Sequence, residues 1–400
     1  MVTKLAIDGG PPVRASMLVF GAPTFDQAEF EEVQDTLKSG WIGTGPKTHK
    51  FENEFSNYVG ASYSVAVSSC TAGLHLGLVV SGIGEGDEVI TTPLTFAATA
   101  NVIIHQKARP VFADIDPYTL NIDPKEIERA ITSRTKAIIP VHFGGLSCEM
   151  DEIERIANQN DLVIIEDAAH AVGTIYNEKM IGGRGNLACF SFYANKNLTT
   201  AEGGMIVTED PEQSKQLTMW HLHGLSRDAW KRFRAQHLVL SEAIYPGFKY
   251  NMTDLQASLG LHQLRKQEHF LLIRERYAKI YDAAFADLPG VRQQPRPSDG
   301  INRHSLHLYV LIIDPAQFRV DRNQIVSALL AENIGASIHY QALHTHTYYR
   351  DQFGYHPGDY SNAAIVGNNI FTLPLTPGMN EKDVNDVIEA VYKVLTAYRV

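Results

Sequence analysis

Residues 190–204 read Phe-Ser-Phe-Tyr-Ala-Asn-Lys-Asn-Leu-Thr-Thr-Ala-Glu-Gly-Gly, and they join two apolar runs. These runs, residues 188–193 and 205–208, predict two buried strands with a turn between them. Lys196 lies in that connection, where a buried amine must be paired or must have a lowered pKa. Only a neutral amine is a nucleophile, so Lys196 is a candidate for Schiff-base chemistry. The structural alternative is a strand-end lysine whose long stem carries its charge out to water.

A second stretch, residues 162–170, reads Leu-Val-Ile-Ile-Glu-Asp-Ala-Ala-His. Four apolar residues run directly into Glu166 and Asp167, a pattern typical of a buried parallel strand that ends in acid. Carboxylates at the C-terminal end of such a strand lie where open α/β sheets bind their ligands. An acid that only caps the following loop is the alternative.

A third stretch, residues 64–78, reads Ser-Val-Ala-Val-Ser-Ser-Cys-Thr-Ala-Gly-Leu-His-Leu-Gly-Leu. A short strand ends at Ser68 and Ser69, and a helical run begins at Thr71 or Ala72. Free N–H groups at such a helix N-terminus favour an anion, most often phosphate. This signal is weak by itself, because serine and threonine are also ordinary N-caps.

Pyridoxal phosphate needs these three parts together: helix N–H groups and hydroxyls for its phosphate, a carboxylate for its pyridine nitrogen and a lysine for its aldehyde. With them the chain resembles the DegT/DnrJ/StrS-type sugar aminotransferase family, within the fold-type-I pyridoxal-phosphate enzymes. The resemblance runs from about Gly40 to the C-terminus. It also rests on Trp41-Ile-Gly-Thr-Gly-Pro46, Glu88-Val-Ile-Thr-Thr-Pro93 and Pro246-Gly-Phe-Lys-Tyr-Asn-Met-Thr-Asp254. One departure is Ala201, which stands where the family usually has a glycine before Glu-Gly-Gly.

The resemblance implies roles for three residues at the reacting end of the cofactor. Lys196 is expected to form the Schiff base and later to move a proton between the substrate carbon and the cofactor. Asp167 is expected to pair with the pyridine nitrogen, and His170 is similar to the position that contacts the ring hydroxyl.

Five more residues are expected around the cofactor by the same resemblance. Cys70, Thr71 and Ser191 supply N–H and hydroxyl contacts to the phosphate. Phe96 matches an aromatic side chain that stacks on the pyridine ring, with a core phenylalanine as the alternative. Asn251 matches an asparagine that reaches the cofactor phosphate of the neighbouring subunit, with a turn residue before the next helix as the alternative.

Substrate contacts are expected from Gly43 and Thr44, in the loop where the family binds its sugar, and from His339 and Tyr340 in the C-terminal part. His344 and His346 form a poor metal signal, since no cysteine or acid accompanies them. We interpret them as surface or supporting residues and predict no metal.

Length, net charge and cysteine usage limit the classes of function that the chain can have. The 400 residues are 44% hydrophobic, enough for a large domain and a smaller one, and the net charge of −10 gives no support to nucleic-acid binding. Cys70, Cys148 and Cys189 match no disulfide framework or zinc spacing, so a reducing cytoplasm is expected. We find no signal-peptide core and no stretch as long as a membrane span.

The order of elements predicts an α/β fold: a large domain with a mostly parallel seven-stranded sheet between helices, and a smaller C-terminal α+β domain. Residues 1–260 are assigned to an extended arm and the large domain, and residues 261–400 to the small domain. The expected strands are residues 64–68, 88–92, 108–113, 137–142, 163–167, 188–193, 205–208 and, in the small domain, 304–313. The expected helices include residues 25–39, 51–59, 254–286, 324–332 and 380–399, with a loop at 40–47.

The function implied is that of a nucleotide-sugar aminotransferase. An amino acid, with L-glutamate preferred, gives its amino group to a keto sugar of a nucleotide-linked deoxysugar, with C4 preferred, in a homodimer with shared sites. A 3-keto sugar, a keto-cyclitol or an aromatic precursor remains open as the acceptor. A non-catalytic regulator on the same fold is a further alternative. A related sugar dehydratase has histidine at the lysine position, so Lys196 argues against it.

Overall fold

The computed structural model describes residues 4–226 and 240–400. Within them, the N-terminal two thirds contain a sheet of seven strands in the order β1-β9-β8-β5-β4-β2-β3. Only β9 runs antiparallel to its neighbours, so the predicted mostly parallel sheet is confirmed. The strands are β1 (Tyr63–Val67), β2 (Glu88–Thr91), β3 (Arg109–Phe112), β4 (Thr135–Ile139), β5 (Val163–Asp167), β8 (Leu187–Ser191) and β9 (Gly204–Thr208).

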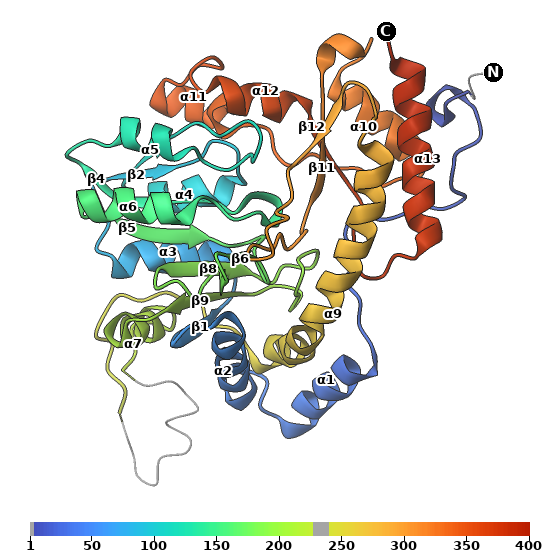
Figure 1. The fold of residues 1–400 in the computed structure, drawn as a ribbon. Coiled ribbons are helices and arrows are strands. Elements are labelled where there is room, and N and C mark those ends of the chain that lie inside the picture. The colour runs from blue at the N-terminus through green and yellow to red at the C-terminus, as the bar shows by residue number, and fades with distance from the viewer. Residues whose placement is uncertain (1–3, 227–239) are drawn as a thin grey trace.

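Helices cover both faces of this sheet (Figure 1). One face packs against α3 (Cys70–Val80), α4 (Ala97–His105) and α7 (Pro211–Trp220). The other packs against α2 (Pro46–Val59), α5 (Pro124–Ala130), α6 (Met150–Asn160) and the first turns of α9 (Asp254–Phe285). The apolar runs seen in the sequence are therefore buried on both sides, as a parallel sheet requires.

The start of α2 differs from the prediction of a loop over residues 40–47. Pro46 already lies in the helix, where its fixed φ and missing N–H are tolerated. The side chain of Asp254 accepts hydrogen bonds from the N–H groups of Gly45 (2.8 Å), Lys47 (3.1 Å) and Thr48 (2.9 Å). A carboxylate that is distant in sequence thus caps this helix, and no local pattern reveals it.

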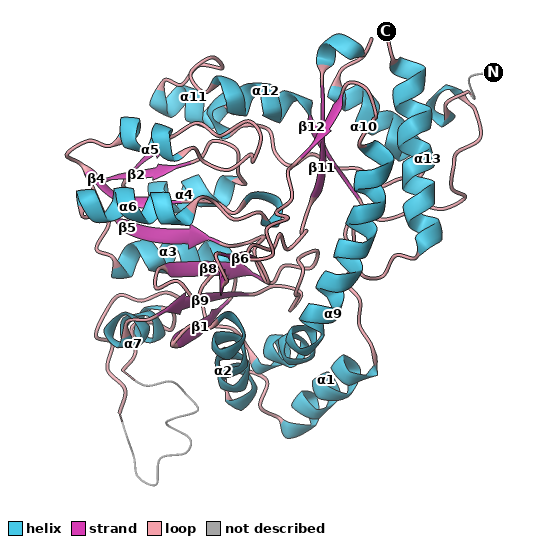
Figure 2. Ribbon diagram, in the orientation of Figure 1, coloured by secondary structure: helices cyan, strands magenta, loops and turns pink. Residues whose placement is uncertain are grey.

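A second sheet lies in the C-terminal third, where β10 (Val291–Gln293), β11 (Tyr309–Ile313) and β12 (Ile370–Leu373) are antiparallel. Its side chains alternate between two cores. Tyr309, Leu311 and Ile313 pack towards α9, α10 (Arg322–Ala331) and α13 (Glu381–Tyr398), while Val310 and Ile312 pack against large-domain residues that include Phe143. Successive side chains of a strand point to opposite faces, so one face of the small sheet packs directly against the large domain (Figure 2).

The predicted strand over residues 304–313 is correct only from Tyr309. Leu306 has a φ of 55°, in the left-handed region that a strand excludes. The N–H of Leu306 donates to Nδ1 of His304 instead of to a neighbouring strand. Residues 304–308 therefore form an irregular segment before β11.

The remaining elements agree with the sequence or complete it. Helix α13 is capped by Asn380 and Asp383, and α9 by Thr253 and Gln256. Also present are α1 (Gln27–Ser39), α11 (Thr347–Phe353), α12 (Ser361–Asn369) and a hairpin of β6 (Ile175–Tyr176) and β7 (Lys179–Met180). The division of the chain near residue 260 stays a prediction.

The N-terminal arm packs on the C-terminal third of the chain. Leu5 lies in its core, and Leu18 forms a β-bridge with Ile334. The buried carboxylate of Glu332 accepts hydrogen bonds from the N–H groups of Ala6 and Val13, both at 2.9 Å, and pairs with Lys393 at 2.8 Å. Figure 1 shows the two termini on the same side of the molecule.

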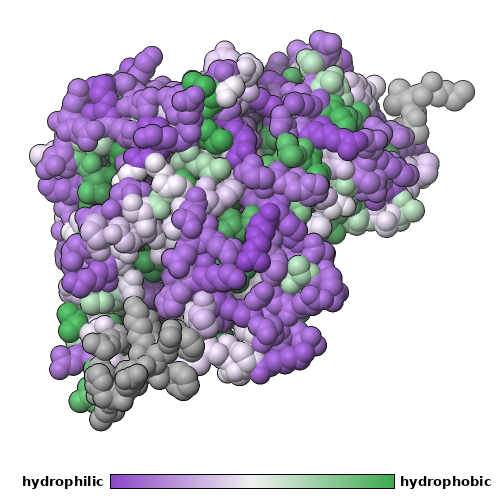
Figure 3. Space-filling view, turned by 60° about the horizontal axis from the view of Figure 1, so that its bottom comes forward, coloured by the Kyte–Doolittle hydropathy of each residue, from purple (hydrophilic) through white to green (hydrophobic). Residues whose placement is uncertain are grey.

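The surface in Figure 3 is mainly hydrophilic, with small separate groups of hydrophobic residues between. None of the helices in residues 4–226 and 240–400 combines the length and the apolar character needed to cross a membrane.

Candidate active site

A cavity of about 340 Å³ opens at the C-terminal ends of the parallel strands, where such sheets bind ligands. The structure brings nine of the predicted site residues to its wall. They are Cys70, Thr71, Phe96, Asp167, His170, Ser191, Lys196, His339 and Tyr340. Residues from the first strand to the last third of the chain thus meet at one place.

Lys196 follows β8 in a turn, in which its N–H donates to the carbonyl oxygen of Tyr193 at 3.0 Å. Burial lowers the pKa of Lys196 to about 8, although Cys70 and Asp167 act in the opposite direction. The place of Lys196 in the cavity wall, where it is partly buried, argues against the alternative of a solvated strand-end lysine. A substantial fraction of this amine is neutral near pH 8, as a nucleophile requires.

Asp167 ends β5 and is buried. Its Oδ2 accepts a hydrogen bond from Thr99 Oγ1 at 2.7 Å, and its Oδ1 accepts one from the N–H of Ala169 at 3.1 Å. Burial raises the pKa of Asp167, and these two hydrogen bonds oppose the rise. A cationic partner inside the cavity would strongly stabilise the charged form of this buried carboxylate.

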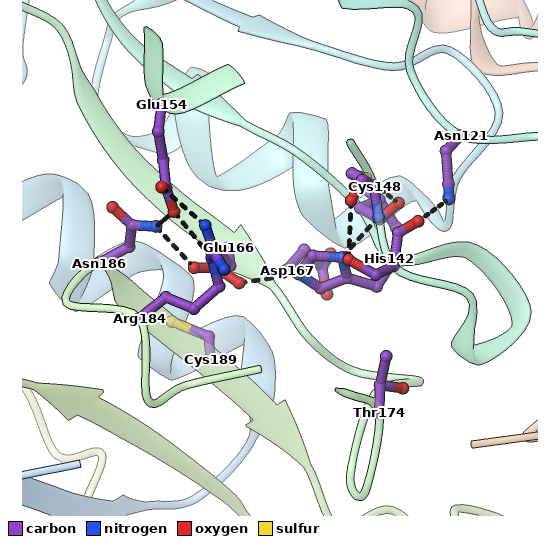
Figure 4. A network of polar contacts seen from close by, with 12 residues as sticks. Asn121, His142, Cys148, Glu154, Glu166, Asp167, Thr174, Arg184, Asn186 and Cys189 are labelled. Atoms are coloured by element: carbon purple, nitrogen blue, oxygen red, sulfur yellow. Dashed lines mark hydrogen bonds and ion pairs between the residues drawn. The ribbon is translucent and has the colours of Figure 1, made fainter. Parts of the chain in front are cut away.

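Behind Asp167, on the opposite side of β5, a buried polar network fixes the strand (Figure 4). Glu166 lies 2.9 Å from His142 Nε2 and accepts a hydrogen bond from Asn186 at 2.9 Å. The backbone of Asp167 is bonded to Pro140 and His142, so the same segment holds both acids. Asp167 is therefore presented from a rigid strand end.

The phosphate end of the predicted site is the N-terminus of α3. The side chain of Ser69 caps the helix by accepting from the N–H of Ala72 at 3.1 Å. Cys70 and Thr71 are the first two helical residues, whose N–H groups have no partner within a helix. A Cβ on Gly204, the first residue of β9, would lie 2.5 Å from the backbone of Ser69, so glycine is required for this close approach.

The aromatic wall of the cavity consists of Phe96, His170, His339 and Tyr340. Nε2 of His170 lies 3.2 Å from the hydroxyl of Tyr340, and the two rings are stacked. Phe96 is 63% exposed and lies at 6.0 Å from the Tyr340 ring, which contradicts the alternative of a core phenylalanine. Burial also lowers the pKa of His339 to about 4.

The other predicted site residues lie close to one another but outside the cavity wall that the described residues form. They are Gly43, Thr44 and Asn251. Asn251 Nδ2 donates to Thr44 Oγ1 at 2.6 Å, and the carbonyl oxygen of Gly43 accepts from the N–H of Asp254 at 2.9 Å. These three predicted residues form a separate polar group at the start of α9.

The structure refines two smaller interpretations. His344 is 0% exposed and packs on Tyr360 with ring centres 5.1 Å apart, so of the two interpretations, surface or supporting residue, only the second remains. Ala201 has a φ of 68° and thus occupies the left-handed conformation that the usual glycine would adopt without strain.

Thr99 and His307 also line the cavity and are not predicted from the sequence. Thr99 supports Asp167 from the first turn of α4, and the pair Thr95 and Thr99 around the start of that helix was the available signal. Nε2 of His307 lies 3.5 Å from Nζ of Lys196. A histidine interrupting an apolar run was the signal there, but the run was interpreted as a plain strand.

Comparison with known proteins agrees with this geometry. The model of the DegT/DnrJ/EryC1/StrS aminotransferase family matches residues 23–392, and the chain belongs to this family. The spore coat polysaccharide biosynthesis protein SpsC of Bacillus subtilis (strain 168) is 49% identical over 383 residues, which are 96% of this chain and 98% of SpsC.

Solved structures show the same fold over nearly the whole chain. Spr1654 of Streptococcus pneumoniae in its PMP form is 34% identical, with a TM-score of 0.89 over 95% of this chain and 99% of that one. DesI, solved in the presence of its TDP-sugar product, is 28% identical, with a TM-score of 0.87 over 99% of this chain and 97% of DesI. The protein is thus a pyridoxal-phosphate-dependent sugar aminotransferase of fold type I.

The residues of the cavity fit this cofactor. A partly buried lysine with a lowered pKa, a buried carboxylate and an open helix N-terminus are all present in one cavity. Each matches one part of the cofactor: aldehyde, pyridine nitrogen and phosphate.

Proposed function

We propose that the protein transfers an amino group from an amino acid, with L-glutamate as the preferred donor, to a nucleotide-linked keto sugar at C4. The observation that carries the proposal is the partly buried Lys196 in the same cavity as the buried Asp167. The nucleotide part is supported by DesI, which was solved with a TDP-sugar. A cytoplasmic location is part of the proposal, and the three buried free cysteines are consistent with it.

Each residue of the cavity has a role in this proposal. Bound pyridoxal phosphate supplies an aldehyde that carries the amino group and a ring that takes up electrons. Lys196 holds the cofactor covalently and moves a proton at its Nζ. Asp167 holds the pyridine nitrogen, and His170 orients the ring through its hydroxyl. Cys70, Thr71 and Ser191 hold the phosphate, Phe96 covers the ring, and His339 and Tyr340 face the sugar.

A panel of substrates tests the reaction. We expect the full-length protein with pyridoxal phosphate and L-glutamate to form an amino sugar from a 4-keto nucleotide sugar, detected by mass spectrometry. The 3-keto isomers and a keto-cyclitol serve as competing acceptors, and L-aspartate and L-alanine as competing donors. Product from the 3-keto sugar alone would reject C4. Failure with every acceptor, together with no change in the cofactor absorption on adding any donor, would reject the aminotransferase reaction in favour of a regulatory role.

We further propose that two subunits share each active site. The separate position of Gly43, Thr44 and Asn251 supports this, because side chains that serve another subunit's cavity need not line their own. In a two-fold dimer the exchange is reciprocal. Gly43, Thr44 and Asn251 of one subunit then contact substrate and cofactor phosphate in the other.

Mixing two inactive variants tests the shared site. Lys196→Ala and Asn251→Glu protomers, after random exchange, give heterodimers with one doubly defective site and one intact site. We expect roughly a quarter of wild-type activity to return, because about half of the dimers are mixed. The control mixes Lys196→Ala with Asp167→Asn, which leaves every site defective. If the Asn251→Glu mixture also stays inactive after demonstrated exchange, Asn251 acts in its own subunit.

A further inference from the structure

His307 reaches the cavity from the irregular segment before β11. It is buried, and its Nε2 lies 3.5 Å from Nζ of Lys196. Lys196 follows β8 of the large sheet, and His307 precedes β11 of the small sheet. The contact between them therefore forms only when the small domain packs on the large one. Arg274 fixes the segment, because its guanidinium donates to the carbonyl oxygens of Leu306 and Leu375.

The hydrogen bonds around His307 decide which ring nitrogen carries the proton. Asn197 Nδ2 donates to the carbonyl oxygen of Ser305 at 2.8 Å, which turns its Oδ1 towards His307 Nδ1 at 3.3 Å. An amide oxygen only accepts hydrogen bonds, so Nδ1 of His307 must carry the proton. Nε2 is then an acceptor with its lone pair towards Lys196.

The other polar groups considered around Lys196 are engaged elsewhere or protonated, so they are not the acceptor for its amine. Nδ1 of His170 faces the N–H of Gly144 and its Nε2 faces Tyr340, while His339 is bonded to Thr372. The thiol of Cys70 has a pKa far above its usual value because of burial, so it remains protonated. Asp167 is engaged by Thr99 and Ala169.

We propose that His307 is a positioning residue for Lys196: its Nε2 accepts a hydrogen bond from Nζ whenever the lysine is free. The inference deepens the proposed function, since the amine must be free in part of each catalytic cycle. A lysine side chain has many rotamers, and one acceptor in the wall selects a single direction for its amine. Burial lowers the pKa of His307 far below its usual value, so the ring stays a neutral acceptor and does not store the proton.

Two substitutions of His307 separate this contact from packing. In His307→Gln the amide oxygen extends about as far as Nε2, so an acceptor for Lys196 remains. In His307→Asn the oxygen extends only as far as Nδ1, and the contact is lost. Both variants are neutral and polar, and they differ mainly in reach.

The experiment uses the full-length protein without cofactor. Lys196 is acetylated by acetic anhydride across a range of pH, and peptide mass spectrometry follows it against the exposed Lys125. The wild-type midpoint is expected near pH 8. An acceptor stabilises the ammonium form, so His307→Asn should lower the midpoint by roughly half a pH unit or more, and His307→Gln by clearly less.

Two results would overturn the proposal: wild-type midpoints in both variants, or equal shifts in both, which would assign the effect to packing. Neutron diffraction from wild-type crystals checks the tautomer without any variant. Deuterium on Nδ1 and none on Nε2 is expected, and deuterium on Nε2 would overturn the assignment. Neither measurement involves cofactor or sugar, so its failure is distinguishable from failure of the proposed function.

Discussion

Replacing Lys196 with alanine is expected to reduce turnover by several orders of magnitude. The change removes the covalent attachment of the cofactor and the group that moves the proton, and no second amine is present in the described wall of the cavity. Steady-state rates with glutamate and the best keto sugar measure the loss. Borohydride reduction followed by peptide mapping should find the cofactor on Lys196 in the wild type and on no lysine in the variant.

Substitution of the exposed Lys125 by alanine is the matched control for Lys196→Ala and should leave both measurements unchanged. Cofactor can remain bound to the Lys196→Ala protein through the phosphate end and Asp167. If this variant keeps near-normal turnover without added amines, another residue carries the chemistry.

Asp167→Asn should abolish most turnover while the cofactor stays bound. The amide has almost the same shape: its oxygen can still accept a hydrogen bond from the N–H of Ala169, and its NH2 group can donate to the hydroxyl of Thr99. It lacks the negative charge that keeps the pyridine nitrogen protonated, so the ring becomes a poor acceptor of electrons. Turnover, together with cofactor content from the absorption spectrum, distinguishes a lost charge from lost binding.

The control for Asp167→Asn is the same change at the exposed Asp287, which should have no effect. Normal rates in Asp167→Asn would mean that the buried acid is structural, like its neighbour Glu166. Loss of both cofactor and thermal stability would point to the same conclusion.

The parts of the fold that the sequence predicts correctly depend on local signals. Residues 162–165 and 205–207 are short apolar runs, and the structure places β5 and β9 there. Asn380 and Asp383 form a capping box that can be recognised within four residues. Asp167 ends β5 and Lys196 lies in the turn after β8, so the same local signals predict their positions.

The parts that were missed depend on contacts between distant residues. Asp254 caps α2 from about 200 positions away, so the true start of that helix cannot be read from residues 40–47. His307 belongs to a segment that departs from strand geometry at Leu306. There the carbonyl oxygen of Leu306 accepts from Arg274 and its N–H donates to Nδ1 of His304, and these bonds prevail over the apolar pattern. Tertiary contacts decide such positions.

The positions of Gly43, Thr44 and Asn251 show a second kind of feature that the sequence of one chain does not predict. The family pattern assigns them to a ligand site, and one subunit alone keeps them apart from its own cavity. In the proposed dimer they would complete the partner's cavity, and a single chain does not encode such an arrangement as a local pattern.

The packing of the N-terminal arm has a consequence for biosynthesis. Ala6 and Val13 precede their acceptor Glu332 by 326 and 319 residues, so they are synthesised well before Glu332 and its partner Lys393. The strands of the large domain end by residue 208, so this domain can begin to fold while the arm still lacks its hydrogen-bond partners. The contacts of the arm with Glu332 therefore form late, because they need residues from the C-terminal third of the fold.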